Sequence, residues 1–301
     1  MYDIVIIGAG PAGLTAAIYA GRAGKKVLVL ESLAYGGQII NTLDINNYPA
    51  EPHISGAELA KKLYVQAKEA RAEFVFEKAL EIENNGAGKI VKTKENEFKT
   101  RAIIIATGSM NKKLGLENED ELVGKGVSYC ATCDGALYKG KIVAVVGGGN
   151  SALWEASYLK DIAKKVYLIH HRDKMRGSGE MVKSLEECEN VEIIYNSEVK
   201  KLNFKEKLES IELLSSDGTT KELKVDGVFV AIGRAPANEE FRNLIKLDSG
   251  GYIVAGESCE TNVEGIFVAG DNRTKTTRQI VTATADGAVA ATAAINFINN
   301  L

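Results

Sequence analysis

The chain has 301 residues, of which 45% are hydrophobic and 26% are charged. This is the balance of a soluble globular protein, and the length is enough for about two domains. The formal net charge of −3 gives no electrostatic reason to expect a nucleic acid or an anionic membrane as a partner. We also expect no apolar run long enough to cross a bilayer.

The first residues, MYDIVII, lack the basic leader and the cleavage site of a signal peptide and are typical of a strand. There are four cysteines, and only two of them are close together, so a secreted disulfide scaffold is not expected. A cytoplasmic location is favoured. In that reducing compartment a close cysteine pair is more often catalytic than structural.

A dinucleotide-binding pattern starts at the predicted strand over residues 4–7. Three glycines follow it, and each has a physical task. Gly8 allows a tight turn, Gly10 lets the backbone approach a pyrophosphate, and Gly13 lets the next helix pack closely on the strand. The N-terminus of that helix would face the phosphates with free N–H groups and a partial positive charge.

The pattern continues with a helix to about residue 23 and a second strand over residues 27–30. Glu31 stands at the end of this strand, where it can accept hydrogen bonds from a ribose diol. Three glycines alone are weak evidence. Strand, glycines, helix, strand and acid in this order favour a nucleotide site over a glycine-rich turn without a ligand.

Two further apolar strands, over residues 102–108 and 227–233, each end in glycine. Each follows a stretch of alternating polar and apolar residues, over 74–99 and 191–225. Turn signals such as the one at residues 84–86 indicate antiparallel hairpins within these stretches. Each half of the chain therefore repeats one unit, in which a βαβ segment is followed by a β-meander and a closing strand.

Cys130 and Cys133 stand three positions apart and are followed by Asp134. Two such thiols can close a readily exchanged disulfide, and their pairing can lower the pKa of the attacking thiol. A neighbouring carboxyl group can supply and remove protons as the disulfide opens and closes. The alternative is half of a zinc site, but no second pair of ligands follows, so we expect no metal.

The dinucleotide pattern recurs after the cysteine pair. A strand over residues 142–146 is followed by Gly147, Gly149 and Ala152, then by a helix to about residue 159 and a strand over 165–169. Asn150 and Ser151 lie in this turn and are also candidate cofactor contacts.

The second unit lacks the acidic residue, because His170 stands where Glu31 stands in the first. His171, Arg172 and Arg176 follow. Loss of the acid with arginine nearby suits a ribose 2′-phosphate, to which the arginine fork is matched. A solvated basic turn is the alternative.

A last apolar strand over residues 265–271 ends in Gly-Asp and precedes an Ala- and Thr-rich helix over 278–296. It has no βαβ segment of its own, so we expect it to complete the first domain.

The predicted fold is α/β, with two Rossmann-like three-layer dinucleotide-binding domains, the second inserted in the first. The first domain would comprise residues 1–112 and 243–301, and the second residues 113–242. Two crossings of one boundary would allow the inner domain to swivel.

Together these motifs resemble those of low-molecular-weight thioredoxin reductases over essentially the whole chain. The motifs that carry the resemblance are GAGPAG at residues 8–13, GGQ at 36–38, ATG at 106–108, CATCDG at 130–135, GGGNSA at 147–152, GD at 270–271 and RQ at 278–279. The resemblance implies FAD in the first domain, NADPH in the second, a homodimer, and a thioredoxin-type redoxin as substrate.

The resemblance also implies roles for single residues. Cys133 would lie against the flavin, Cys130 would attack the redoxin, and Asp134 would be the general acid and base. Contacts to the FAD are expected from Gly8, Gly10, Gly13, Glu31, Gln38, Asn47, Thr107, Gly108, Asp271, Arg278 and Gln279. Contacts to NADPH are expected from Gly147, Gly149, Asn150, Ser151, Ala152, His170, Arg172 and Arg176.

Two departures from the family bear on the electron donor. His171 replaces the usual arginine, and because imidazole is mostly neutral at pH 7, one phosphate contact is weakened. Trp154 stands where an acidic residue is common. A thioredoxin reductase fed by ferredoxin, an NADH-dependent disulfide reductase serving a peroxidase system, and a flavin-bound redox sensor are therefore alternatives.

Three features are expected to have no catalytic part. Cys188 lies among acidic residues, which raise the pKa of a thiol, and Cys259 precedes Glu260 in a loop. The acidic run at residues 117–121 is expected to be a solvated face of a linker.

Overall fold

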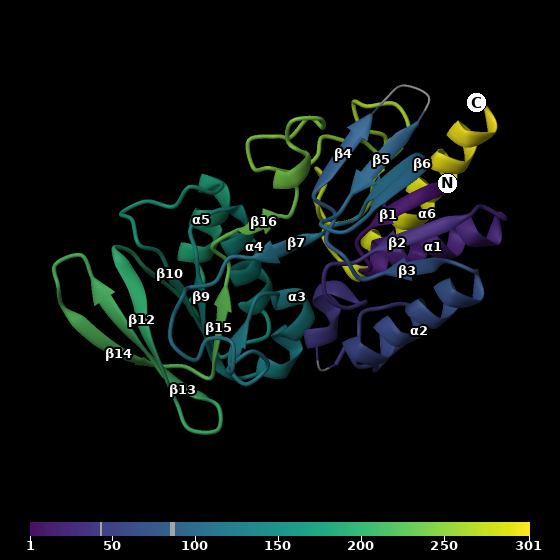
Figure 1. Cartoon of the computed structure of the whole chain (residues 1–301). Coiled ribbons are helices and arrows are strands. Elements are labelled where there is room, and N and C mark those ends of the chain that lie inside the picture. The colour runs from purple at the N-terminus through teal and green to yellow at the C-terminus, as the bar shows by residue number, and fades with distance from the viewer. Residues whose placement is uncertain (43, 85–87) are drawn as a thin grey trace. The chain divides into compact units, whose positions relative to one another are not determined.

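The computed structural model describes residues 1–42, 44–84 and 88–301, so most of the turn predicted at 84–86 lies outside the described residues (Figure 1). The chain forms two compact units. Unit 1 comprises Met1–Met110 and Ala235–Leu301, and unit 2 comprises Asn111–Arg234. The return to unit 1 precedes the predicted residue 243, because Asn238 and Phe241 are already buried there.

Unit 1 is built on a seven-stranded sheet. Its parallel strands are β3 (Glu73–Val75), β2 (Val27–Leu30), β1 (Tyr2–Ile7), β6 (Glu97–Ile105) and β17 (Ile266–Val268). Two antiparallel strands, β4 (Glu81–Asn84) and β5 (Lys89–Lys92), extend it. The long strand β6 belongs to both parts, since its first half pairs with β5 and its second half with β17.

The helices of unit 1 are α1 (Pro11–Arg22), α2 (Gly56–Glu69) and α6 (Ile280–Asn299), with short 3₁₀ turns η1 (Gly37–Asn41) and η3 (Glu239–Phe241). Proline occupies the first position of α1, where no intrahelical donor is lost. Ser55 and Glu58 form a capping box at the start of α2. Figure 1 shows α6 beside α1, and the alanines of α6 allow this close approach.

Among the described residues, α6 alone has the length and the mean hydropathy, 1.3, that would suit a membrane span. This corrects the expectation that no apolar run reaches that length. The helix packs on α1 and buries Ala290, Ala291 and Ala294 completely, and its one charged residue, Asp286, is ion-paired. One face of the helix is thus packed against α1, and its one charge is neutralised within unit 1.

Unit 2 contains a five-stranded parallel sheet and a three-stranded antiparallel sheet. The parallel strands are β11 (Val191–Ile194), β10 (Lys165–Ile169), β9 (Ile142–Val146), β15 (Gly227–Val230) and β8 (Val127–Ser128). The antiparallel strands are β12 (Ser197–Phe204), β13 (Leu208–Ser215) and β14 (Thr220–Lys224). The helical elements are α3 (Ala131–Asp134), η2 (Gly135–Tyr138), α4 (Asn150–Leu159) and α5 (Gly179–Glu186).

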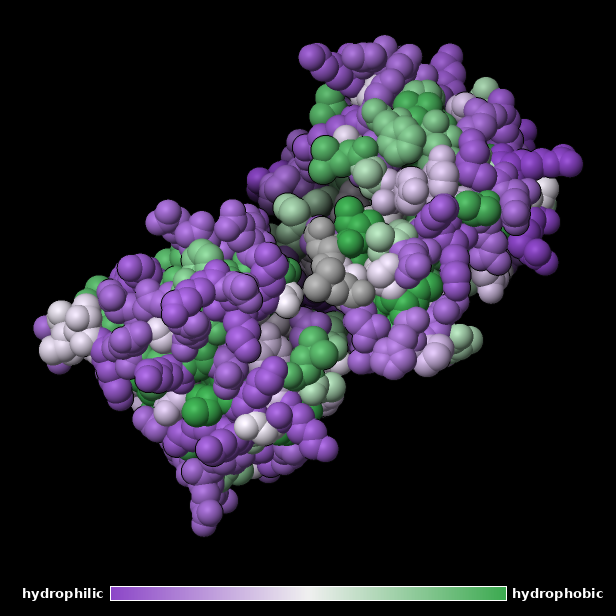
Figure 2. Space-filling model, turned by 90° about the horizontal axis from the view of Figure 1, so that it is seen from below, coloured by the Kyte–Doolittle hydropathy of each residue, from purple (hydrophilic) through white to green (hydrophobic). Residues whose placement is uncertain are grey.

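The two α/β units predicted from the repeated motifs are confirmed. Two strands differ from the prediction, because β3 and β11 are parallel edge strands of the main sheets and not members of the antiparallel meanders. Each follows a helix, which returns the chain to the edge of the sheet in the parallel direction. The surface seen in Figure 2 is largely hydrophilic, in keeping with a chain in which 26% of residues are charged.

The central strands are covered on both faces, which explains their unbroken apolar sequence. In β1, Ile4 and Ile6 pack into one core cluster with α1, α2 and α6. Val5 and Ile7 pack into the cluster on the opposite face. The glycine-rich turn that follows β1 therefore starts from a rigid strand end.

Candidate active site and nucleotide-binding turns

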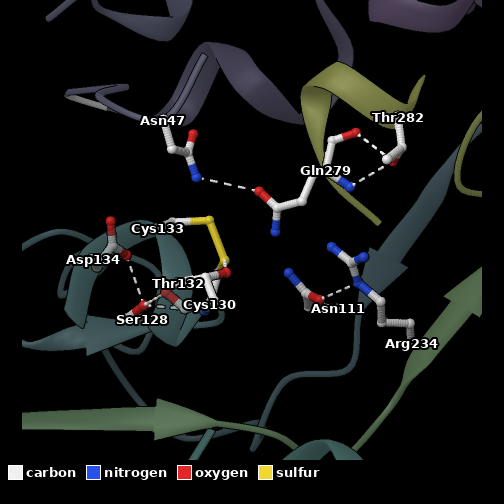
Figure 3. The surroundings of a disulfide bond; sticks show 10 residues. All are labelled: Asn47, Asn111, Ser128, Cys130, Thr132, Cys133, Asp134, Arg234, Gln279 and Thr282. Carbon is white, nitrogen blue, oxygen red and sulfur yellow. Dashed lines mark hydrogen bonds between the residues drawn. A yellow bond between two sulfur atoms is a disulfide. The ribbon is translucent and has the colours of Figure 1, made fainter. Parts of the chain in front are cut away.

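Cys130 and Cys133 form a disulfide with Cα atoms 5.3 Å apart (Figure 3). Strand β8 leads into Cys130, which is the N-cap residue of α3. Cys133 lies within α3 itself. The backbone carbonyl of Cys130 accepts hydrogen bonds from the N–H groups of Cys133, at 3.2 Å, and Asp134, at 3.1 Å. The predicted pair is thus held in one helical turn.

Ser128 connects this turn to the carboxyl group of Asp134. Its Oγ donates a hydrogen bond to Asp134 Oδ2 at 2.6 Å and accepts one from the Cys130 N–H at 3.1 Å (Figure 3). Burial raises the pKa of Asp134, and the hydrogen bond from Ser128 opposes this only in part. The carboxyl group can therefore hold a proton more readily than an exposed aspartate can. The sequence analysis did not identify Ser128.

A second carboxyl group lies beside α3. Glu155 of α4 accepts a hydrogen bond from the Ala131 N–H. Burial raises its pKa to about 8, although the charge of Arg234 and the Ala131 bond both lower it. Sequence reasoning missed this residue, and the available signal was an acid within the otherwise uncharged helix sequence NSALWEASYL. Its neighbour Trp154 is 63% exposed.

Unit 1 contains a cavity of about 570 Å³ at the end of its parallel strands. Eight of the predicted FAD contacts line it: Gly8, Gly10, Glu31, Gln38, Thr107, Gly108, Asp271 and Gln279. The turn after β1, the ends of β2 and β6, and the turn after β17 thus meet around one space. Such a meeting of strand ends is where open α/β sheets bind ligands.

Glycine is needed at each position of the first turn for a different structural reason. A Cβ on Gly8 would lie 2.4 Å from the carbonyl oxygen of Ala106, and Gly8 has a φ of +109°. A Cβ on Gly13 would lie 1.9 Å from the carbonyl oxygen of Gly8. Gly13 thus allows the helix to pack against the turn, whereas Gly10 lines the cavity and a Cβ there would meet nothing within 4 Å. A side chain at Gly10 would enter the space that a pyrophosphate needs.

Glu31 holds the shape of this turn. One carboxylate oxygen accepts from the Ala9 N–H at 2.8 Å, and the other accepts from the Leu33 N–H at 3.1 Å. The carboxylate also lines the cavity. It therefore fixes the glycine turn while remaining available to a ligand.

The remaining predicted contacts of unit 1 lie around the start of α6. Asn47 Nδ2 donates to Gln279 Oε1 at 3.3 Å (Figure 3). Arg278 donates to the carbonyl oxygen of Asp271 at 3.4 Å, and its guanidinium lies 4.2 Å from the ring centre of Tyr252. Arg278 thus holds the turn that presents Asp271 to the cavity.

The structure adds residues that the sequence did not indicate. Lys78 and Glu240 line the cavity and form an ion pair at 2.6 Å. Asn238 is buried; its amide nitrogen donates to the carbonyl oxygen of Asn272 at 2.8 Å, and its amide oxygen accepts from Thr107 Oγ1 at 3.2 Å. These partners are far apart in sequence, so no local motif marks them.

The glycine turn of unit 2 has the same construction. A Cβ on Gly147 would lie 2.3 Å from the carbonyl oxygen of Ala231, whereas a Cβ on Gly149 would meet nothing within 4 Å. Asn150 Oδ1 accepts from the Ser178 N–H at 2.8 Å. Ser151 is exposed, and Ala152 is fully buried against the sheet.

His170 lies behind this turn and not at the solvent face. It is 1% exposed, and a Cβ on Gly148 would lie 2.3 Å from its ring. Burial lowers the pKa of His170, and the neighbouring His171, Arg176 and Arg172 lower it further. The ring therefore acts as neutral packing under the glycine backbone.

His171, Arg172 and Arg176 are among the exposed side chains near the turn. Arg172 Nε donates a hydrogen bond to His171 Nε2 at 3.2 Å. The backbone N–H of Arg176 donates to the carbonyl oxygen of Gly148 at 2.7 Å. The basic segment is therefore tied to the glycine turn at its backbone.

The other two cysteines are placed as inert thiols. Cys259 is completely buried, and burial raises its pKa to about 11. Cys188 is half-buried and donates to the carbonyl oxygen of Ser184 at 3.1 Å.

Within residues 1–42, 44–84 and 88–301, no group of three or more His, Cys, Asp or Glu side chains could hold a metal ion.

Comparison with known proteins gives consistent matches over the whole chain. Residues 2–287 match the family described as pyridine nucleotide-disulphide oxidoreductase. The chain is 44% identical to thioredoxin reductase of Bacillus subtilis (strain 168) over 303 residues, which cover 100% of this chain and 96% of that protein. It is 39% identical to thioredoxin reductase of Peptoclostridium acidaminophilum, with 99% and 97% covered. The crystal structure of thioredoxin reductase from Streptococcus pyogenes MGAS5005 superposes with a TM-score of 0.95 at 38% identity, covering 100% of this chain and 99% of that one.

Proposed function

The chain belongs to the pyridine nucleotide-disulphide oxidoreductase family, and we propose that its unit 1 holds FAD and its unit 2 holds NADPH. The enzyme is a thioredoxin-disulfide reductase, which carries electrons from NADPH through FAD and the Cys130–Cys133 pair to a thioredoxin-type protein. The observation that carries the proposal is the Cys130–Cys133 disulfide beside a partly buried carboxyl group, Asp134, in a chain with two glycine-lined dinucleotide turns.

The cavity of unit 1 fits FAD by its own construction. Gly10 leaves room for a pyrophosphate against the backbone, and the N-terminus of α1 faces that room. The carboxylate of Glu31 borders the same cavity and can accept from a ribose diol. When bound, FAD converts the two-electron hydride chemistry of a nicotinamide into electrons that can open a disulfide.

The chain's own residues then carry out thiol–disulfide exchange. Opening the Cys130–Cys133 disulfide consumes two electrons and two protons. The thiolate of Cys130 attacks the disulfide of the redoxin and forms a mixed disulfide, and Cys133 displaces the reduced redoxin as their own disulfide re-forms. Asp134 can hold the proton that these thiols exchange, because burial favours its protonated form.

Unit 2 would bind NADPH at the turn after β9. Gly149 leaves the backbone open to a pyrophosphate. Arg172 and Arg176 are exposed beside that turn, where their guanidinium groups can reach a 2′-phosphate. His171 is a weaker partner for the phosphate than an arginine, because Arg172 already engages its Nε2.

We also propose that unit 2 rotates against unit 1 during turnover, since one flavin face cannot hold the nicotinamide and the disulfide together. The chain crosses between the units in two paired strands, β7 (Ser109–Asn111) and β16 (Arg234–Pro236). The second hinge would thus lie before Asn238, because this residue is buried and hydrogen-bonded within unit 1.

The enzyme is proposed to act in the cytoplasm as a homodimer. Support for a dimer comes from the outer face of α6, which carries no charge because Asp286 is the one charged residue of the helix and is buried. Val281 and Val289 of this face are each 41% exposed, and Tyr19 of the adjacent α1 is 50% exposed. Light scattering would show a dimer, and charged substitutions at both valines should give monomers if this face is the interface.

Two other donors remain alternatives on specific grounds. The exposed Trp154, and His171 in place of an arginine, would weaken binding of NADPH, which favours NADH or ferredoxin. A flavin-bound sensor is the non-enzyme alternative. Anaerobic bleaching of the flavin by NADPH, NADH and reduced ferredoxin in parallel distinguishes the donors, and a redoxin-coupled assay distinguishes the sensor.

The proposal for FAD has its own test. The purified protein should be yellow and hold about one FAD per chain, and Gly10→Leu should abolish binding because the side chain would fill the cavity. A colourless wild-type protein that FAD cannot reconstitute would refute the assignment of unit 1.

A further inference from the structure

A buried ion cluster lies next to the cavity of unit 1. The side chain of Asp286 is 9% exposed, and those of Arg273 and Lys275 are 5% and 7% exposed. Asp286 Oδ2 accepts from Arg273 Nε at 2.9 Å and from Lys275 Nζ at 2.8 Å, while Oδ1 accepts from Arg273 NH2 at 2.8 Å. No motif in the sequence pointed to these three residues.

The same carboxylate binds the backbone of the cavity wall. Asp286 Oδ2 also accepts from the Gly270 N–H at 2.9 Å. Gly270 and Asp271 both line the cavity, so this bond joins α6 to the turn that faces the ligand. Gly270 has a φ of +93°, a conformation in which glycine is favoured.

The bond between Asp286 and Gly270 lies where the Gly270 turn, α6 and the start of α1 pack closely together. A Cβ on Gly270 would lie 2.9 Å from Ala12 Cβ, and a Cβ on Gly287, next to Asp286, would lie 2.2 Å from the Ala12 carbonyl oxygen. Ala12 belongs to the first turn of α1, which also lines the cavity. A shift of the Gly270 turn would therefore move it against the helix end that faces the cavity.

Stability alone is a poor explanation for such a cluster. Taking charges out of water is costly, and buried ion pairs can often be replaced by apolar residues without loss of stability. Burial raises the pKa of Asp286, but the bonds from Arg273, Lys275 and Gly270 outweigh it and hold the pKa below its usual value. The carboxylate is therefore an ionised acceptor throughout the working pH range.

We propose that Asp286 is a positioning residue for FAD, which holds the Gly270–Asp271 turn in the shape of the cavity through its bond to the Gly270 amide. Arg273 and Lys275 neutralise the carboxylate and orient it. The proposal rests on the assignment of FAD to unit 1. It assigns to Asp286 no contact with the cofactor.

A matched pair of variants isolates the bond to Gly270. Asp286→Asn and Asp286→Leu are each combined with Arg273→Met and Lys275→Met, so that neither protein carries an uncompensated buried charge. The asparagine can still accept from the Gly270 N–H, and the leucine cannot. FAD affinity is measured by fluorescence titration of each apoprotein, and the apoprotein melting temperature is measured separately.

The leucine variant should bind FAD at least about tenfold more weakly than the asparagine variant, which is the loss expected for one hydrogen bond. Equal affinities for FAD in the two proteins would overturn the proposal, whatever their melting temperatures. A wild-type protein that binds no FAD would instead refute the function proposed for unit 1.

A control variant and a wild-type measurement complete the test. Glu119 of unit 2 is 2% exposed and accepts hydrogen bonds from the N–H groups of Leu114 and Gly115. Glu119→Gln therefore removes another buried carboxylate, at a position far from the first glycine motif in the sequence. It should lower stability and leave FAD affinity unchanged. If the triple variants fail to fold, amide exchange in the wild-type apoprotein decides, since rapid exchange of the Gly270 N–H would contradict a standing bond to Asp286.

Discussion

Glu155 provides a direct test of how the redox helix is supported. Its carboxyl group accepts from the Ala131 N–H, one residue after Cys130, and burial raises its pKa from 4.5 to about 8. In the unfolded chain the group would have its ordinary pKa. The folded state therefore binds a proton over a pH range in which the unfolded state does not.

The sign of the effect on stability follows from this difference. A group whose folded pKa is raised contributes stability that is fully present below its unfolded pKa and is lost as the pH rises through its folded pKa. For Glu155 the loss begins near pH 4.5 and is complete above about pH 8. One pKa unit corresponds to about 1.4 kcal/mol, so between about pH 5.5 and pH 8.5 the loss is about 3–4 kcal/mol.

Glu155→Gln removes the titrating group and keeps a side chain of similar size. Urea unfolding at several pH values should show that the wild-type protein loses this free energy of unfolding on going to alkaline pH, while the variant does not. Asp161→Asn, at an exposed carboxylate just beyond α4, is the control and should follow the wild type. Parallel pH profiles for the wild-type protein and the Glu155→Gln variant would refute the assignment of a protonated carboxyl group at this site.

Other predictions concern the dithiol and the donor. Cys130→Ser should leave a long-wavelength charge-transfer band in the flavin spectrum and abolish redoxin reduction, whereas Cys188→Ser should remain active in the same assay. Ser128→Ala removes a hydrogen bond that lowers the pKa of Asp134, so the pH profile of redoxin reduction should shift to alkaline pH. His171→Arg should raise kcat/KM for NADPH about tenfold and leave that for NADH nearly unchanged. An equal change for NADPH and NADH would contradict a contact between this side chain and the 2′-phosphate.

The features that depend only on residues adjacent in the sequence were predictable from the sequence. The turn after β1 requires glycine because the chain must reverse within a few residues, and a Cβ on Gly8 or Gly13 would meet backbone oxygen closer than 2.5 Å. The CxxC spacing allows both thiols to lie in one helical turn, as Cys130 and Cys133 do. The two α/β units follow from the same local patterns repeated, since strand, turn and helix are determined over short stretches of chain.

Burial of charged groups was decided by the tertiary structure. The run at 117–121 is typical of a solvated linker face, but Glu119 is 2% exposed and accepts from backbone N–H groups and from Tyr129. Asp286 and Glu155 are likewise acids within apolar helices, and their protonation states differ. Asp286 meets Arg273 and Lys275 and stays ionised, whereas burial outweighs the charge of Arg234 at Glu155 and favours its protonated form.

The same reason accounts for the parts of the site that sequence reasoning missed. Thr107 and Asn238 are 131 positions apart, yet they form a hydrogen bond at the point where the chain leaves and re-enters unit 1. The strands β3 and β11 join their sheets in parallel because a helix returns each of them to the sheet edge. A sequence pattern reports the chemistry of adjacent residues. The pKa, the burial and the partner of a side chain depend on the solvent that distant segments exclude, and only the folded chain determines those.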